Sequence, residues 1–116
     1  MDIAHRRISR VDVLSLAGRM MPPEAALLKE QIDPLFAEGR YRIVLDLSQL
    51  EYISSGGLRV LIEARKRAQD GKPTDGGRGD VVIVNAAQRI KDVLSMTGFT
   101  SYFQMYDDLA EAVGSF

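Results

Sequence analysis

The stretch Ile43–Leu61, which reads IVLDLSQLEYISSGGLRVL, constrains the fold of this chain more than any other. Its first five residues are apolar except for Asp46, which is typical of a strand buried on both faces of a sheet. Leu58, Leu61 and Ile62 then recur at helical spacing. The sequence therefore predicts a buried strand, a short turn and a helix in direct succession.

The predicted turn is Ser54-Ser55-Gly56-Gly57. A serine hydroxyl suits a helix N-cap, where it accepts a hydrogen bond from a free backbone N–H. The first helical turn also carries unpaired N–H groups and the positive end of the helix dipole, which favour an anion. In open α/β sheets, ligands tend to bind where a parallel strand ends. We therefore predict that Ser55 is a regulated phosphate acceptor at the functional edge of the sheet.

The first forty residues predict a hairpin and a helix. Two strands within Met1–Ala17, ended by Gly18, form an edge hairpin whose polar residues face water. Pro22-Pro23 suits the opening of a helix, and Gly39 suits its end. Pro34 falls inside this helix, so we expect a kink or an irregular last turn there.

The second half of the chain predicts further alternation of helices and strands. The serine turn leads into a helix over Gly57–Gln69, and the glycine-rich segment Gly71–Asp80 is expected to be a mobile surface loop. Val81–Val84 is a second buried strand. The remaining elements are a helix after Asn85 that holds Ile90, Val93 and Leu94 and stops at Gly98, a short strand in Phe99–Tyr106, and a final helix capped by Asp107.

The resulting order is ββαβαβαβα, without an internal repeat or a linker. Strands that alternate with helices require parallel pairing through right-handed crossovers. We therefore predict one α/β domain over residues 1–116. Its mixed sheet has about five strands, parallel apart from the N-terminal edge hairpin, and is covered by about four helices.

Composition excludes several functional classes. The 15 basic and 16 acidic residues give a net charge of −1, so no nucleic-acid or membrane surface is expected. The chain has no cysteine, which suits the cytoplasm. It opens with no basic-then-apolar leader, and no apolar run approaches the roughly 18 residues of a membrane span. We expect a cytoplasmic protein, monomeric because no large exposed apolar face is evident.

The serine turn does not carry an enzyme motif. The sequence lacks the P-loop and Rossmann fingerprints, and it lacks the Gly-x-Ser-x-Gly of a nucleophile elbow. The single histidine, His5, lies on the predicted edge strand, so no general base is expected beside the serines. No carboxylate pairs with histidine at metal-ligand spacing. Asp46 either shapes the serine turn or is satisfied by backbone N–H groups, and Ser54 or Ser55 could simply be a helix cap.

Two long segments resemble the signature of STAS domains, specifically of bacterial anti-sigma factor antagonists. The first comprises Leu45-Asp46-Leu47-Ser48 and the run Tyr52–Leu61. The second comprises Val82-Ile83-Val84-Asn85, the helix that ends at Thr97-Gly98-Phe99, and the closing Tyr106-Asp107 with Glu111-Ala112. The resemblance covers nearly the whole chain in order.

The resemblance implies a STAS-like domain that works as a phosphorylation-controlled binding partner. The family's phosphorylated serine falls on Ser55. The position before it is commonly aspartate in the family but is Ser54 here, so Ser54 is a second, adjacent candidate hydroxyl. Partner binding would use Ser54, Gly56, Gly57, Leu58 and Arg59. The unphosphorylated protein would bind an anti-sigma factor that is also a serine kinase. Phosphorylation would release that partner, and a metal-dependent serine phosphatase would reset the switch. The protein itself would have no catalytic activity, cofactor or metal.

Two other functions remain open from the sequence. The first is a STAS module that regulates a transporter or a sensor complex in trans through the same helix. The second is a nucleotide- or flavin-binding α/β protein that uses Ser54–Gly57 as its phosphate cradle, although no base-recognition motif accompanies that turn.

Overall fold

Five strands form one mixed sheet in the computed structural model, which describes residues 1–99 and 101–116. The strands are β1 (Asp2–Ile8), β2 (Val11–Met20), β3 (Arg42–Ile53), β4 (Asp80–Val84) and β5 (Met105–Tyr106). The helices of the described chain are α1 (Pro22–Ala37), α2 (Ser55–Asp70), α3 (Gln88–Met96) and α4 (Leu109–Gly114).

The strands lie in the sheet in the same order as in the sequence, β1-β2-β3-β4-β5. β1 pairs with β2 in antiparallel register, and the other neighbouring strands pair in parallel. The predicted α/β class, the edge hairpin and the mixed sheet are therefore confirmed.

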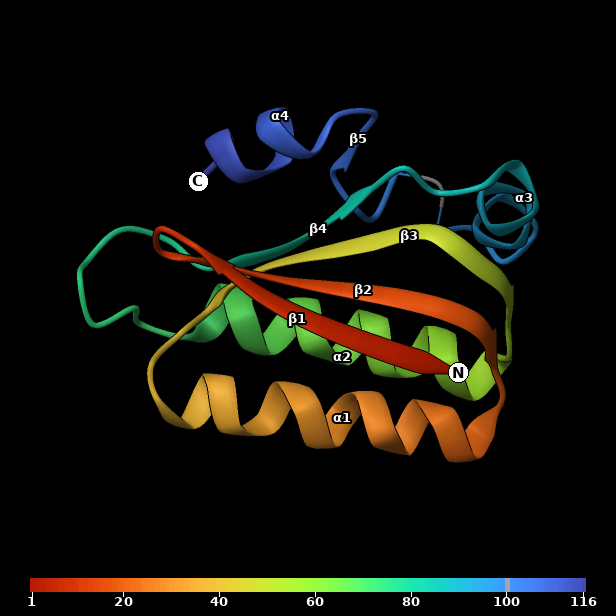
Figure 1. The fold of residues 1–116 in the computed structure, drawn as a ribbon, viewed down its shortest axis with the longest axis horizontal. Helices are drawn as coiled ribbons and strands as arrows, with labels where there is room; N and C mark the ends of the chain where they lie inside the picture. Colours follow the sequence, from red (N-terminus) through yellow and green to blue (C-terminus); the bar gives the residue numbers. More distant parts are fainter. Residues whose placement is uncertain (100) are drawn as a thin grey trace.

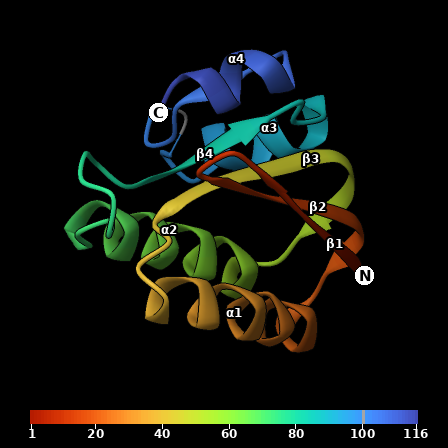
Figure 2. The same ribbon diagram turned by 60° about the vertical axis from the view of Figure 1, so that its left-hand side comes forward.

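Helices cover both faces of the sheet (Figure 1). α1 and α2 lie side by side on one face, α4 lies on the opposite face, and α3 lies at one end of the sheet (Figure 2). The alternation of side chains along β2 explains the two apolar layers, because successive residues of a strand point to opposite faces. Leu14 and Leu16 join the larger cluster, whereas Val11 and Val13 join a smaller one that includes Ala112 of α4.

Two boundaries near the serine turn differ from the prediction. The antiparallel pairing of the hairpin ends at Ala17, directly before Gly18 as predicted, but β2 itself continues to Met20 along β3, with an irregular register near that glycine. The φ of Gly18 is +104°, a conformation that favours glycine and lets the strand bend without ending. β3 extends beyond its apolar start to Ile53, so the strand reaches the serine turn directly.

The C-terminal part differs in two further boundaries. The strand predicted within Phe99–Tyr106 is limited to Met105–Tyr106, and Thr100 of that range lies outside the described residues. Tyr102 packs edge-on against both Phe99 and Phe103, so these rings form an aromatic cluster in place of a regular strand. The N-cap of α4 is Asp108 and not Asp107, and its side chain makes no capping hydrogen bond.

α1 continues through Pro34 and ends in an irregular turn, as its sequence predicts. The Glu38 N–H donates to the carbonyls of both Pro34 and Leu35, each at 3.1 Å, which tightens the last turn. Gly39 follows with a φ of +77°, where glycine is the favoured residue.

The loop that follows α2 has specific contacts, although we expected a mobile segment at Gly71–Asp80. Pro73 and Gly79 are buried, and a Cβ on Gly79 would lie 2.2 Å from the carbonyl oxygen of Ala68. Arg42 donates hydrogen bonds to the Asp75 carboxylate and to the Gly76 carbonyl. The loop is therefore attached to the start of β3.

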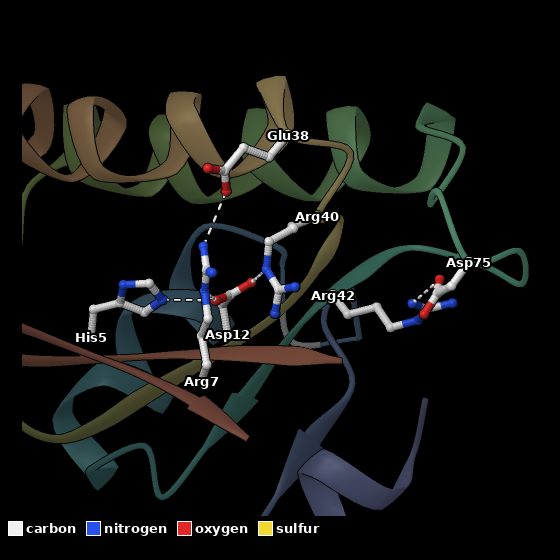
Figure 3. A network of polar contacts seen from close by, with 7 residues as sticks. All are labelled: His5, Arg7, Asp12, Glu38, Arg40, Arg42 and Asp75. Atoms are coloured by element: carbon white, nitrogen blue, oxygen red, sulfur yellow. Dashed lines mark hydrogen bonds and ion pairs between the residues drawn. The ribbon is translucent and has the colours of Figure 1, made fainter. Parts of the chain in front are cut away.

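A fully buried carboxylate, Asp12, joins the edge hairpin to the segment after α1 (Figure 3). Its oxygens lie 2.8 Å from His5 Nε2, 3.2 Å from Arg7 Nε and 2.7 Å from Arg40 Nε. Arg7 also donates to Glu38 at 3.0 Å. His5 lies on the edge strand as predicted, and this pairing gives it a structural partner in Asp12.

Candidate functional site

The serine turn is held in place by the ends of two neighbouring parallel strands. Met20 of β2 pairs with Ile53 of β3, and the Ser54 N–H donates to the Met20 carbonyl at 2.8 Å. Because Ser54 follows β3 immediately, this hydrogen bond fixes the start of α2 against the sheet.

Ser54 is the N-cap of α2. Its backbone is extended, with φ −76° and ψ 166°, and its hydroxyl accepts a hydrogen bond from the Gly57 N–H at 3.1 Å. Its carbonyl accepts from the Leu58 N–H at 2.9 Å. Ser54 is only 9% exposed. Its hydroxyl is therefore used to begin the helix and is covered by neighbouring atoms.

Ser55 is the first residue of α2 and is exposed to solvent. It lies at the positive end of a helix of 16 residues whose first turn contains no acidic side chain. An added anion at Ser55 would therefore meet a favourable local field. The two adjacent serines thus differ: Ser54 is buried and bonded, whereas Ser55 is accessible.

The two glycines of the turn have different amounts of free space. A Cβ on Gly57 would lie 2.7 Å from Met20 Sδ and 3.0 Å from Ile53 Cγ1, so the helix packs directly on the strand ends there. A Cβ on Gly56 would meet only the Ser54 hydroxyl oxygen, at 3.8 Å, which is an ordinary contact. Gly57 is thus required by packing, whereas position 56 has room for a small side chain.

The remaining residues predicted to bind a partner divide between core and surface. Leu58 is 5% exposed and belongs to the main apolar cluster, so its packing in the core positions the helix. Arg59 is exposed and lies four residues after Ser55, which places the two side chains on one face of α2. Ser55 and Arg59 are the fully exposed members of the predicted set, and Gly56 is half-buried.

Sequence reasoning missed three further exposed residues beside the turn. The Arg19 guanidinium lies 4.9 Å from the centre of the Tyr52 ring, and the two residues are paired across β2 and β3. Tyr52 and Met21 are among the exposed large apolar residues, each 39% exposed. The sequence places Tyr52 shortly before the serine turn, and Arg19 and Met21 shortly before α1. Their exposure could not be predicted, because it depends on the irregular ends of the strands.

Other candidate groups do not converge on this turn. Asp46 accepts a hydrogen bond from the Ser48 N–H at 3.0 Å, so its carboxylate is satisfied by nearby backbone. Within residues 1–99 and 101–116, no three histidine or acidic side chains are grouped to hold a metal ion. None of the helices in the described chain has both the length and the apolar character that a membrane crossing needs.

A family model described as "STAS domain" matches residues 2–112. The chain belongs to the STAS domain family. The resemblance found in the sequence is thereby confirmed, and the exposed Ser55 lies at the start of α2 in a STAS fold.

Three relatives place this STAS protein beside anti-sigma factor antagonists. BtrV of Bordetella bronchiseptica, named as an anti-sigma factor antagonist, is 27% identical over 116 residues, which are all of this chain and 95% of that protein. A structure from Thermotoga maritima with the same description has a TM-score of 0.83 at 24% identity and covers 97% of this chain and 92% of its own.

The third relative is the anti-sigma factor antagonist SpoIIAA from Bacillus, whose structure is known in two forms. The unphosphorylated form has a TM-score of 0.81 at 15% identity and covers 98% of this chain and 95% of its own. The phosphorylated form has a TM-score of 0.74, also at 15% identity. At these identities the likeness concerns the fold alone.

Proposed function

We propose that this STAS protein is an anti-sigma factor antagonist in a partner-switching pathway, controlled by phosphorylation of Ser55. The observation that carries the proposal is the contrast within the serine pair: Ser55 is exposed at the start of α2, whereas Ser54 is buried as the helix cap. A kinase can reach the Ser55 hydroxyl without unfolding the helix. The name of the relative BtrV supports the same general function.

The unphosphorylated protein binds an anti-sigma factor that is also a serine kinase. The surface around Ser55 offers the cations Arg19 and Arg59 beside the exposed Tyr52 and Met21. Such a surface suits a partner that presents carboxylates next to apolar side chains, because aromatic residues and arginines contribute most strongly to protein interfaces.

Phosphorylation weakens this complex through electrostatics and leaves the fold unchanged. A phosphoserine adds about −1.5 to −2 charges at the positive end of α2. It also places acceptor oxygens one turn before Arg59, so they compete with the partner for that guanidinium. If a partner carboxylate lies about 5 Å away, the repulsion at an effective dielectric of about 20 is roughly 5–7 kcal/mol before screening.

A smaller net effect is sufficient for switching. A loss of about 3 kcal/mol weakens binding roughly a hundredfold. A metal-dependent serine phosphatase then removes the phosphate and restores binding. In this cycle the protein is a substrate and a binding partner, with no catalytic role of its own and no nucleic-acid or membrane ligand. It acts as a monomer in the cytoplasm.

The proposal is tested by isothermal titration of the protein against the anti-sigma factor kinase of the same organism, without ATP. We expect wild type and Ser55→Ala to bind, and Ser55→Glu and Arg59→Ala to bind at least tenfold more weakly. Gln69→Glu, which adds a charge near the other end of α2, is the matched control and should bind as wild type does. Equal binding by Ser55→Glu and Gln69→Glu would contradict the proposed docking surface.

A further inference from the structure

A cavity lies at the opposite end of α2 from Ser55. This cavity, of about 590 Å³, opens where the β1–β2 turn, the loop after α2 and the C-terminal segment converge. These three segments lie at the same end of the molecule in both ribbon views (Figures 1 and 2), and α2 begins at the other end. The volume falls within the usual range for small-molecule sites.

Four arginines line this cavity, and two of them are held in fixed positions. The Arg42 side chain is only 5% exposed, and it donates to Asp75 Oδ1 at 2.7 Å (Figure 3). It also donates to the Gly76 carbonyl. Arg65 donates to Asp80 Oδ1 at 2.9 Å and to the Tyr102 carbonyl. Their guanidinium groups are therefore oriented before any ligand arrives, which lowers the entropic cost of binding.

The other two arginines leave the cavity with excess positive charge. Among the described residues, Arg78 forms no ion pair, and Arg10 reaches Asp75 only at 3.5 Å. Asp80 lines the cavity and pairs with Arg65, and Asp75, which is not part of the lining, pairs with Arg42, so these two carboxylates offset part of the charge of the four guanidinium groups. The end of α2 adds only the partial negative charge of its terminal carbonyls. A cavity of this charge favours an anionic ligand.

An apolar part of the lining accompanies the arginines. Val82 of β4 is buried in the cavity wall, and the half-buried rings of Tyr106 and Phe116 lie along it. Aromatic and aliphatic surface of this kind packs against a ring or a hydrocarbon portion of a ligand. Guanidinium groups, in turn, match the geometry of phosphate oxygens.

We propose that this cavity binds a small organic phosphate whose non-phosphate part is a flat ring. The arginines hold the phosphate, and Val82, Tyr106 and Phe116 contact the ring. The site is separate from the serine turn and does not depend on the proposed partner switch, because no residue of Ser54–Arg59 lines the cavity. A ligand here could bind whether or not Ser55 is phosphorylated.

Phenyl phosphate is the simplest probe of this chemistry, with phenol and inorganic phosphate as controls. Titration of the labelled protein, followed by amide NMR shifts at constant ionic strength, should give saturable shifts at Gly77–Asp80, Val82 and Tyr106 with phenyl phosphate. Inorganic phosphate should bind at the same residues more weakly, and phenol should not bind. Amides of the serine turn should not move.

Two charge-matched variants localise the interaction. Arg78→Gln should weaken phenyl phosphate binding roughly tenfold or more, because it removes charge-assisted hydrogen bonds to the phosphate. Arg59→Gln, at the other end of α2, should not change it. The inference is overturned if phenyl phosphate at millimolar concentration gives no saturable shifts, if the shifts centre on Ser54–Gly57, or if both variants weaken binding equally.

Discussion

Replacing each glycine of the serine turn by alanine tests how α2 is seated on the sheet. A methyl group at position 57 would overlap Met20, which is 0% exposed, and would press on Ile53, which is 3% exposed. Overpacking of this kind costs about 1–3 kcal/mol, and it exceeds the gain of up to about 1 kcal/mol from alanine in a helix. Gly57→Ala should therefore destabilise the protein by about 1–2 kcal/mol.

Gly56→Ala is the matched control at the neighbouring position. Its methyl group would meet only the Ser54 hydroxyl oxygen, at 3.8 Å, so the helix-propensity gain should dominate. We expect stabilisation of about 0.5–1 kcal/mol. The two variants should thus differ by about 2 kcal/mol, or roughly 6–12 °C in Tm for a domain of this size.

Urea unfolding followed by circular dichroism, together with thermal scans, measures both variants against wild type. If Gly57→Ala were as stable as Gly56→Ala, the close packing of the helix start on Met20 and Ile53 would be refuted. The exposure of Ser55 depends on that same position of the helix on the sheet.

Three further predictions concern side chains whose contacts are known. Asp12→Ala should lower the free energy of unfolding by about 1.5–3 kcal/mol, measured in urea, because it removes a fully buried carboxylate that accepts hydrogen bonds from the partly exposed Arg7 and Arg40. Ser54→Ala should cost about 1 kcal/mol through loss of the helix cap, whereas Ser55→Ala should stay within about 0.5 kcal/mol of wild type in the same assay. The hydrogen bond from Arg42 lowers the pKa of Asp75 from its ordinary value of 3.8, so the folded state binds this proton less readily than the unfolded state. The stabilisation from Asp75 should be present above the unfolded pKa and should be lost as the pH falls through the lower folded pKa.

Each of these expectations has a contradicting result. Wild-type stability in Asp12→Ala would mean that the ion pairs of Asp12 with Arg7 and Arg40 carry no net stabilisation. Equal losses in Ser54→Ala and Ser55→Ala would mean that the cap is not specific to Ser54. For Asp75, the comparison is with Asp75→Asn, whose stability difference from wild type should shrink below about pH 4. A difference that is independent of acid pH would contradict the Arg42–Asp75 pairing.

The strand–turn–helix unit was predictable because its signals are local. The apolar run of β3, the helical spacing of Leu58 and Leu61 and the hydroxyls at the helix start each report on neighbouring residues. The same holds for the prolines that open α1 and the glycine that ends it. The mixed sheet followed from the alternation of these elements.

Features that depend on distant contacts were not predictable from the sequence. The distinction between Ser54 and Ser55 arises from burial against the strand ends, which neither hydroxyl reveals by its position alone. Gly18 suggested the end of a strand because its role in a bend depends on the partner strand. The arginine cavity joins residues 10 and 78, which only the folded chain brings together.

The central claim is that the exposed hydroxyl of the serine pair accepts the phosphate. Its most direct test is mass spectrometric mapping after incubation with the anti-sigma factor kinase and ATP, using wild type, Ser54→Ala and Ser55→Ala. We predict one phosphate, on Ser55, in wild type and Ser54→Ala, and none in Ser55→Ala. Full modification of Ser55→Ala on Ser54 would contradict the claim.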